Sequence, residues 1–129
     1  FLDFALEDGE GNTECSLSLD NPGSSPVAFK VKTTKPKRYL VRPNQGVVRP
    51  AGQLTVSIVL LAQDKRELIT EYRQTGTCND TNKFMLQVLP LADSAATTLA
   101  LSSQTWENAK AQVQQKKLVV RFSFPRPVI

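Results

Sequence analysis

The 129-residue chain contains no histidine and only two cysteines, Cys15 and Cys78. Two cysteines without histidine cannot complete a standard zinc site, which takes four ligands. The chain has no run of about 18 apolar residues, so no segment of it is expected to span a bilayer or to direct secretion. It also lacks a G-x-S-x-G motif, a phosphate-binding loop and a clear pair of carboxylates on facing strands. We therefore predict a protein that is not an enzyme and needs no cofactor.

The two cysteines leave two interpretations open. Two free thiols in a reducing compartment is the simpler one, because small secreted domains usually carry more disulfides. A single Cys15–Cys78 bridge is the alternative. Asn79-Asp80-Thr81 fits the N-glycosylation sequon, and we interpret it as a chance match in a polar loop. A glycan or the bridge would favour a secreted adhesion domain.

Length and composition predict one globular domain over residues 1–129. Hydrophobic residues make up 40% of the chain and charged residues 22%, which is typical of a folded protein rather than a disordered or fibrous one. At this length, folding buries roughly two thirds of the surface of the unfolded chain. The first residue is Phe1 rather than Met, which indicates a fragment of a longer protein.

Charge is distributed unevenly along the chain. The net charge is +4, yet residues 1–20 contain six acidic side chains and no basic one. The stretch VAFKVKTTKPKRYLVRPN, residues 27–44, contains six basic side chains and no acidic one. This pattern favours an anionic partner, with some internal neutralisation by the acidic lead segment. A merely solvated basic surface is the alternative.

Alternation of apolar and polar residues with period two predicts mostly short strands. In residues 27–32, for example, Val27, Phe29 and Val31 fall on one face, and Lys30 and Lys32 fall on the other. We read a turn at residues 43–46 and a long polar excursion at residues 63–82 with a helical turn around 65–72. A helix is expected over residues 103–114. The predicted strands cover residues 1–4, 15–20, 27–34, 39–42, 54–61, 83–89 and 117–124.

Several motifs carry a family resemblance. Trp106 follows both cysteines, so the Cys-Trp-Cys order of antibody-type domains is absent. The motifs VAFKVKTT, PKRYLVRPN, KFMLQ, TWENAK and KLVVRFSFP together resemble the major sperm protein (MSP) domain of the VAMP-associated protein (VAP) family. The resemblance runs from about Phe1 to Pro125. It implies an all-β fold, an immunoglobulin-like seven-stranded antiparallel β-sandwich with one short helix. The excursion at residues 63–82 looks longer than in the family.

The same resemblance implies a function. VAP-type domains are non-enzymatic adaptors at the cytosolic face of the endoplasmic reticulum, anchored by a membrane helix that follows a coiled coil. They capture FFAT motifs, two phenylalanines in an acidic tract, carried by lipid-transfer and tethering proteins at membrane contact sites. Pro43 would shape a turn in the fold. The residues that correspond to the family's peptide groove are Lys30, Val31, Lys32, Thr33, Thr34, Asn44, Lys83, Phe84, Met85 and Lys117.

The chemistry of these side chains agrees with that role. The lysines would steer an acidic peptide, and a phosphate in its tract would also be favoured. Met85 and the lysine stems can form a soft slot for an aromatic side chain. Thr33 and Thr34 offer hydroxyls and Asn44 an amide. Each of these residues also has a purely structural interpretation. The lysines could protect a sheet edge against aggregation, the threonines could be ordinary strand residues, and the methionine could fill the core.

Two other function classes compete with peptide capture. Nematode sperm proteins of the same fold form filaments, so self-assembly is the runner-up, and a homodimer is compatible with either function. Nucleic-acid binding is not expected, because the predicted helix at residues 103–114 is not basic and exposed stacking aromatics are scarce. We expect contact with a membrane only through an anchor outside this chain.

Overall fold

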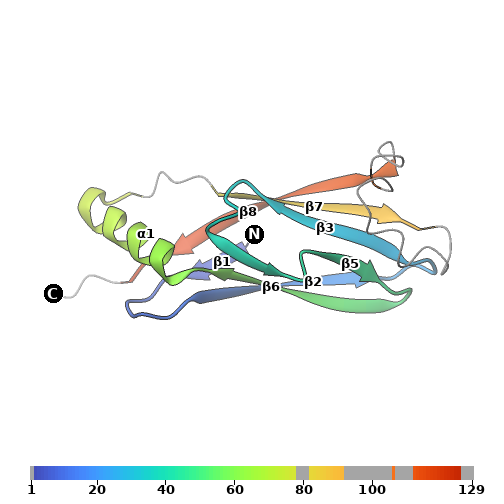
Figure 1. Ribbon diagram of the computed structural model, residues 1–129, viewed down its shortest axis with the longest axis horizontal. Coiled ribbons are helices and arrows are strands. Elements are labelled where there is room, and N and C mark those ends of the chain that lie inside the picture. The colour runs from blue at the N-terminus through green and yellow to red at the C-terminus, as the bar shows by residue number, and fades with distance from the viewer. Residues whose placement is uncertain (1, 78–81, 92–105, 107–111, 126–129) are drawn as a thin grey trace.

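The computed structural model describes residues 2–77, 82–91, 106 and 112–125. Eight strands and one helix lie in this part of the chain, with the helix beyond one end of the strands (Figure 1). The elements are β1 (Leu2–Ala5), β2 (Thr13–Asn21), β3 (Val27–Thr33), β4 (Tyr39–Arg42), β5 (Gln45–Val48), β6 (Gly52–Leu60), α1 (Ala62–Thr75), β7 (Lys83–Pro90) and β8 (Gln114–Ser123).

The strands form two sheets packed as a sandwich. One sheet has the order β1-β8-β7-β3-β5, and the other has the order β2-β6-β4. The predicted immunoglobulin-like sandwich is confirmed, with two corrections. The described residues contain eight strands instead of seven, and β1 pairs with β8 in parallel. Parallel pairing is possible because β1 and β8 come from the two ends of the chain and need no tight turn between them.

The additional strand is β5, whose first two residues, Gln45 and Gly46, fall within the turn that the sequence predicted at residues 43–46. Gly46 lies opposite Phe29 in the pairing of β3 with β5. A Cβ atom on Gly46 would come within 3.0 Å of the Phe29 ring, so the glycine makes room for a core aromatic side chain instead of forming a turn. Asn44 immediately precedes this strand, and its carbonyl accepts a hydrogen bond from the Val31 N–H at 2.8 Å. The Arg42–Pro43 peptide bond just before it is cis.

Aromatic side chains dominate the core between the sheets. Phe4, Phe29 and Phe84 are almost completely buried. The Tyr39 ring meets the Phe84 ring edge-on, with ring centroids 4.8 Å apart, and lies 5.6 Å from the Phe4 ring. Such edge and tilted contacts add to the free energy gained by burying the rings. The core therefore joins strands of both sheets directly behind the amino-terminal end of β7.

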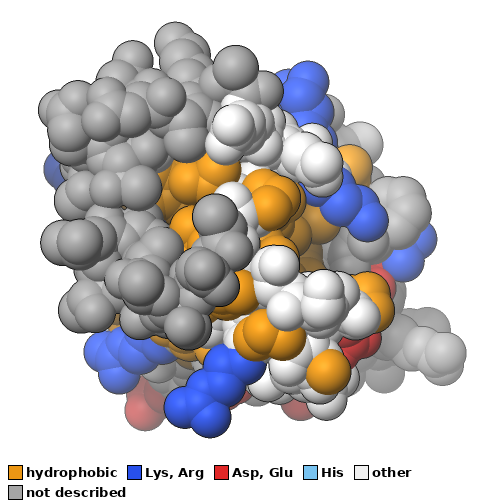
Figure 2. All heavy atoms as spheres, turned by 90° about the vertical axis from the view of Figure 1, so that its right-hand side faces the viewer, with side chains coloured by type: hydrophobic (Ala, Val, Ile, Leu, Met, Phe, Trp, Pro, Cys, Tyr) orange, Lys and Arg blue, Asp and Glu red, His pale blue; other side chains and the backbone are white. Residues whose placement is uncertain are grey.

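A second apolar cluster covers part of the outer face of the larger sheet. It contains Ala28, Leu89, Leu91 and Trp106, all buried. Figure 2 shows apolar side chains at the end of the molecule opposite to α1, with lysine and arginine side chains around them. Trp106 thus packs against the sandwich. The rest of the helix predicted at residues 103–114 falls almost entirely outside the described residues, and Gln114 begins β8.

Helix α1 corrects the prediction of a long loop with one helical turn. It has 14 residues, and it buries Lys65, Leu68 and Ile69 on one face, which is the spacing of neighbours on a helix surface. The ring of Tyr72 stacks on that of Phe124 with centroids 4.1 Å apart. Gly76 ends the helix in the left-handed conformation with φ of 74°, the usual place for glycine at a helix end. With so few apolar residues, its sequence resembled a loop.

Residues distant in sequence stabilise both ends of α1. Leu61, at the cap position, makes no side-chain hydrogen bond to the helix. Instead, Asn12 Oδ1 accepts a hydrogen bond from the Ala62 N–H at 2.8 Å. Near the other end, Arg73 forms an ion pair with Asp8 at 2.6 Å. The acidic lead segment therefore neutralises some basic charge within the molecule, as the charge distribution suggested.

We expect Asn12→Ala to lower the free energy of unfolding by about 1 kcal/mol, the typical cost of losing a side-chain cap. The measurement is urea unfolding followed by circular dichroism. Asn12→Asp keeps an acceptor oxygen at the same place and is the matched control. Equal stability of Asn12→Ala and the wild type would show that this hydrogen bond does not stabilise α1.

Candidate functional site

Three neighbouring strands form a row of lysine, methionine and lysine on the outer face of the larger sheet. Lys32 of β3 lies directly opposite Met85 of β7, and Met85 lies opposite Lys117 of β8. Directly opposed residues on one face have Cβ atoms about 5 Å apart. Both lysines are exposed and Met85 is half-buried. Pairing in this register thus places one apolar side chain between two cations contributed by distant parts of the sequence.

A hollow surrounds this row and is called the Met85 hollow below. Its volume is about 210 Å³, and it is lined by Lys32, Thr33, Thr34, Lys83, Phe84, Met85 and Lys117. The lining is largely apolar despite three lysines, because the aliphatic stems of lysine cover apolar surface while their ammonium groups stay in water. Seven of the ten residues that the family resemblance assigned to the groove are therefore brought together. The hollow combines apolar contact with positive charge.

Hydrogen bonds hold the end of β3 against the start of β7. The Thr34 N–H donates to the Lys83 carbonyl at 3.0 Å, and the Lys83 N–H donates to Thr34 Oγ1 at 3.2 Å. Thr33 Oγ1 accepts a hydrogen bond from the Lys35 N–H at 3.1 Å. Both hydroxyl groups act as acceptors here, so these bonds leave their O–H protons to donate to a ligand. The two threonines thus shape the site and offer donors to it.

Phe84 borders the Met85 hollow, but its side chain belongs to the core. Only 1% of its surface is exposed, and its ring packs against Tyr39. Successive strand residues point to opposite faces, so Phe84 points inward between the outward-pointing Lys83 and Met85. It supports the hollow from behind.

Asn44 lies in a second hollow, the Asn44 hollow, which adjoins the first. Its volume is about 480 Å³, and it shares Lys32 and Thr33 with the Met85 hollow. Sequence analysis also named Val31, Lys32 and Thr33, but it missed the remaining residues of this hollow, since the two strands that enclose it, β3 and β4, belong to different sheets. No local pattern says which strand edges will face each other. The lining residues are Val31, Lys32, Thr33, Pro36, Tyr39, Leu40, Val41 and Asn44.

Lys30 is the predicted site residue that borders neither hollow. Its Nζ lies 4.8 Å from the centroid of the Trp106 ring, within the range of a cation–π interaction. Burial, and next the positive charge of Lys32, lower the pKa of Lys30. Lys30 therefore adds to the local field, but its ammonium group is engaged with Trp106.

Two further cations of β8 differ from Lys117 in their surroundings. Lys116 is exposed and lies opposite Leu86, on the other face of the strand from Lys117. Arg121 Nε donates to Asp3 Oδ1 at 2.8 Å, and this hydrogen bond holds the pKa of Asp3 below its usual value. The charge of Arg121 is thereby balanced within the protein.

Other kinds of site find little support in the described residues. In that part of the chain, no group of three or more His, Cys, Asp or Glu residues is placed to hold a metal ion. Cys15 is a free thiol whose pKa is raised mainly by burial, whereas Cys78 and Asn79 lie outside the described residues. The helix seen in this part of the structure is too short and too polar to cross a membrane.

Comparison with known families decides the classification. The MSP (major sperm protein) domain family matches residues 3–111. The chain belongs to this family. The MSP domain described here is similar to vesicle-associated protein 1-2 of Arabidopsis thaliana, with 38% identity over 88% of the chain and 44% of that protein. It is 34% identical to vesicle-associated membrane protein-associated protein A of Homo sapiens, over 85% of the chain and 39% of that protein.

These relatives make it a VAP-type MSP domain, and the chain spans less than half of their length. A third relative, scs2 of Schizosaccharomyces pombe, is 34% identical over 74% of the chain and 23% of its own length. Solved structures support the fold. SSP-19, an MSP-domain protein of Caenorhabditis elegans, has a TM-score of 0.51 at 17% identity, covering 86% of this chain and 88% of its own. The PapD-like domain 7 of human CEP192 has a TM-score of 0.57 at 11% identity, covering 98% of this chain and 82% of its own.

Proposed function

We propose that this MSP domain is a non-enzymatic adaptor that captures short acidic peptides carrying two phenylalanines, of the FFAT type. The row of Lys32, Met85 and Lys117 carries the proposal. An apolar contact enclosed by cations suits an aromatic side chain in an acidic sequence. Charge alone would attract any anion, whereas Met85 adds selection for an apolar group.

The two adjacent hollows support a motif with two aromatic side chains. Since they share Lys32 and Thr33, neighbouring residues of one extended peptide can enter both. In an extended chain successive side chains point in opposite directions, and the two hollows lie on either side of the end of β3. One phenylalanine would occupy the Met85 hollow and the other the Asn44 hollow, where the Asn44 amide can bind the peptide backbone.

The charges around the site support an acidic flank. Lys32, Lys83 and Lys117 line the Met85 hollow, and none of the described residues that line it is acidic. Exposed charges mainly raise the association rate, in a manner that depends on salt. The cellular setting belongs to the same proposal: partners among lipid-transfer and tethering proteins, at contact sites on the cytosolic face of the endoplasmic reticulum. The names of the relatives, which refer to vesicles and membranes, agree with this setting.

The test is isothermal titration of the domain with an acidic peptide containing two adjacent phenylalanines. We expect a dissociation constant in the micromolar range, about −8 kcal/mol. Replacing either phenylalanine of the peptide by alanine should weaken binding at least about 10-fold, because each ring fills its own hollow. A peptide of the same composition in scrambled order controls for charge.

Equal binding of the scrambled peptide would show that the domain recognises the charge of the peptide and not the order of its residues. No binding by the folded domain would overturn peptide capture and leave the lysines as solvated residues of the sheet. Self-assembly would then become the leading hypothesis, and a size that grows with protein concentration in the absence of peptide would support it.

A further inference from the structure

Helix α1 lies at the end of the sandwich where β3 ends and β7 begins (Figure 1). One of its contacts there is aromatic, since the Tyr72 ring stacks on that of Phe124, just after β8. The face that α1 buries is only weakly apolar, because one of its three buried residues is Lys65. Polar contacts therefore contribute to holding α1 on the sandwich.

A partly buried ion pair joins α1 to the loop at residues 34–38. Arg38 Nε lies 3.7 Å from Asp64 Oδ1, and the two side chains are 14% and 25% exposed, respectively. Salt screens charges in such a position less than charges on an open surface. The Leu61 N–H, just before α1, also donates to the Arg38 carbonyl at 3.1 Å. Both the side chain and the backbone of Arg38 are thus tied to the amino-terminal end of α1.

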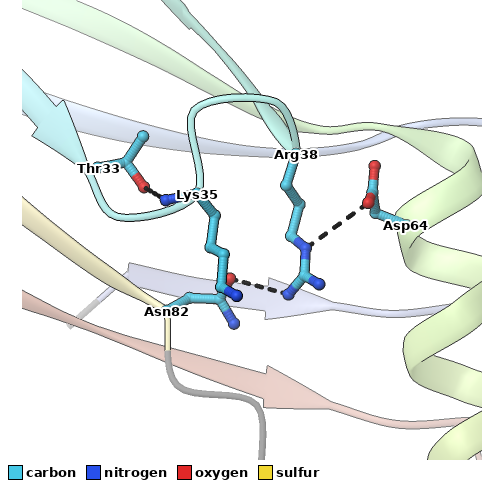
Figure 3. Close-up of polar contacts among 5 residues, drawn as sticks. All are labelled: Thr33, Lys35, Arg38, Asp64 and Asn82. Atoms are coloured by element: carbon cyan, nitrogen blue, oxygen red, sulfur yellow. Dashed lines mark hydrogen bonds and ion pairs between the residues drawn. The ribbon is translucent and has the colours of Figure 1, made fainter.

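The same guanidinium group holds the residue that precedes β7. Arg38 Nη1 donates to Asn82 Oδ1 at 2.9 Å, and Asn82 is buried. Figure 3 shows the guanidinium group between Asp64 on α1 and Asn82 at the start of β7. Because a buried amide oxygen is costly to leave without its hydrogen bond, this contact restricts where Asn82 can lie.

Asn82 is followed directly by a residue of the Met85 hollow. Lys83 lines that hollow, as does Thr34. The N–H and the carbonyl of Lys83 both form hydrogen bonds with Thr34, so a shift of Asn82 would move this wall of the hollow. Contacts therefore run without a break from Asp64 through Arg38 and Asn82 to the candidate site.

We propose that Asp64 is a positioning residue for the Met85 hollow, and this inference rests on the proposed function. Asp64 itself does not contact the peptide. It holds Arg38 against Asn82, and Lys83 is thereby fixed before the peptide arrives. A site that is ordered in advance loses less conformational entropy on binding, which raises its affinity.

Removal of the Asp64 carboxylate distinguishes positioning from a simple field effect, because the two predict opposite signs. A carboxylate near the site repels an acidic peptide, so a field effect would make Asp64→Ala bind more tightly. We expect Asp64→Ala to bind the acidic two-phenylalanine peptide about 3- to 10-fold more weakly. Asp64→Glu keeps the carboxylate and should bind within about twofold of the wild type. The measurement is isothermal titration calorimetry.

The matched control is Asp8→Ala. It removes the same charge and also breaks an ion pair with α1, since Asp8 pairs with Arg73 at 2.6 Å, but this pair lies near the other end of the helix. We expect it to change the affinity by less than about twofold.

A second variant breaks the proposed series of contacts at its other link. Asn82→Ala should weaken binding by a factor similar to that of Asp64→Ala. Because the two links act in series, the Asp64→Ala/Asn82→Ala variant should lose no more than the larger of the two single losses. Losses that multiply would show that the two residues act independently and would overturn the series.

Amide hydrogen exchange reports the positioning without a peptide. We expect the Thr34 and Lys83 amides to exchange at least about 3-fold faster in Asp64→Ala than in the wild type, and at the wild-type rate in Asp8→Ala. Unchanged exchange in Asp64→Ala, unchanged or tighter peptide binding by it, or an equal loss of affinity in Asp8→Ala would each overturn the inference. Thermal unfolding shows whether each variant is folded.

Failure of the wild-type domain to bind the peptide would instead reject the proposed function. The exchange rates would still show whether Asp64 orders the start of β7, so the two failures are distinguishable.

Discussion

We expect the Lys83→Asp/Met85→Asp variant to bind the acidic two-phenylalanine peptide at least about 100-fold more weakly than the wild-type domain. The change removes the apolar floor of the Met85 hollow and puts two negative charges beside an acidic ligand. Loss of one buried apolar contact at the centre of an interface typically costs about 2 kcal/mol or more, and repulsion between like charges adds to it. The measurement is isothermal titration calorimetry.

The double variant is expected to stay folded, because Lys83 is exposed and Met85 half-buried on the outer face of β7. Circular dichroism and thermal unfolding check this. Lys116→Asp serves as the control for a change of charge on the neighbouring strand and should bind nearly as well as the wild type. A folded double variant that binds within about threefold of the wild type would remove Met85 and Lys83 from the site.

The second large effect concerns stability. We expect Phe84→Ala to lower the free energy of unfolding by about 3–5 kcal/mol, the usual cost of removing a core phenylalanine. The ring is 1% exposed and meets Tyr39 edge-on with centroids 4.8 Å apart, so its loss leaves a cavity between the two sheets. A loss of this size is a large part of the total stability of a small domain. Urea unfolding measures it.

Phe84→Leu separates the structural role of Phe84 from a direct role in binding. Leucine keeps an apolar side chain in the core, so the variant should remain folded at room temperature. We expect its peptide affinity to stay within about threefold of the wild type, since the ring points away from the Met85 hollow. A folded Phe84→Leu domain that no longer binds would instead show that the peptide contacts the ring.

Much of the sandwich could be predicted from the sequence because strand formation leaves a local signal. The alternation at residues 27–32 reports which side chains share a face, and it placed Lys32 on the outer face of its strand correctly. Alternation in residues 83–85 likewise puts Met85 and Lys83 on one face of β7. These two placements contain the central part of the candidate site, and they needed no knowledge of partner strands.

Helix α1 and strand β5 were misread because their signals depend on packing. The three residues that α1 buries include a lysine, so its apolar face is weak in sequence. Its cap comes from Asn12, 50 residues earlier, so a search for a capping residue next to the helix in sequence cannot find it. In β5, Gly46 resembled a turn residue, although its role is to make room for Phe29 on the neighbouring strand.

The sequence by itself determined the family and the all-β architecture, and it named the residues of the Met85 hollow together with three that lie outside it, since these follow from motifs and from the faces of single strands. Only the tertiary structure decided how strands pair and which edges meet. Register placed Met85 between Lys32 and Lys117, packing turned Lys30 toward Trp106, and the approach of β4 to β3 opened the Asn44 hollow. Contacts between strands depend on residues far apart in sequence, and no local pattern encodes their geometry.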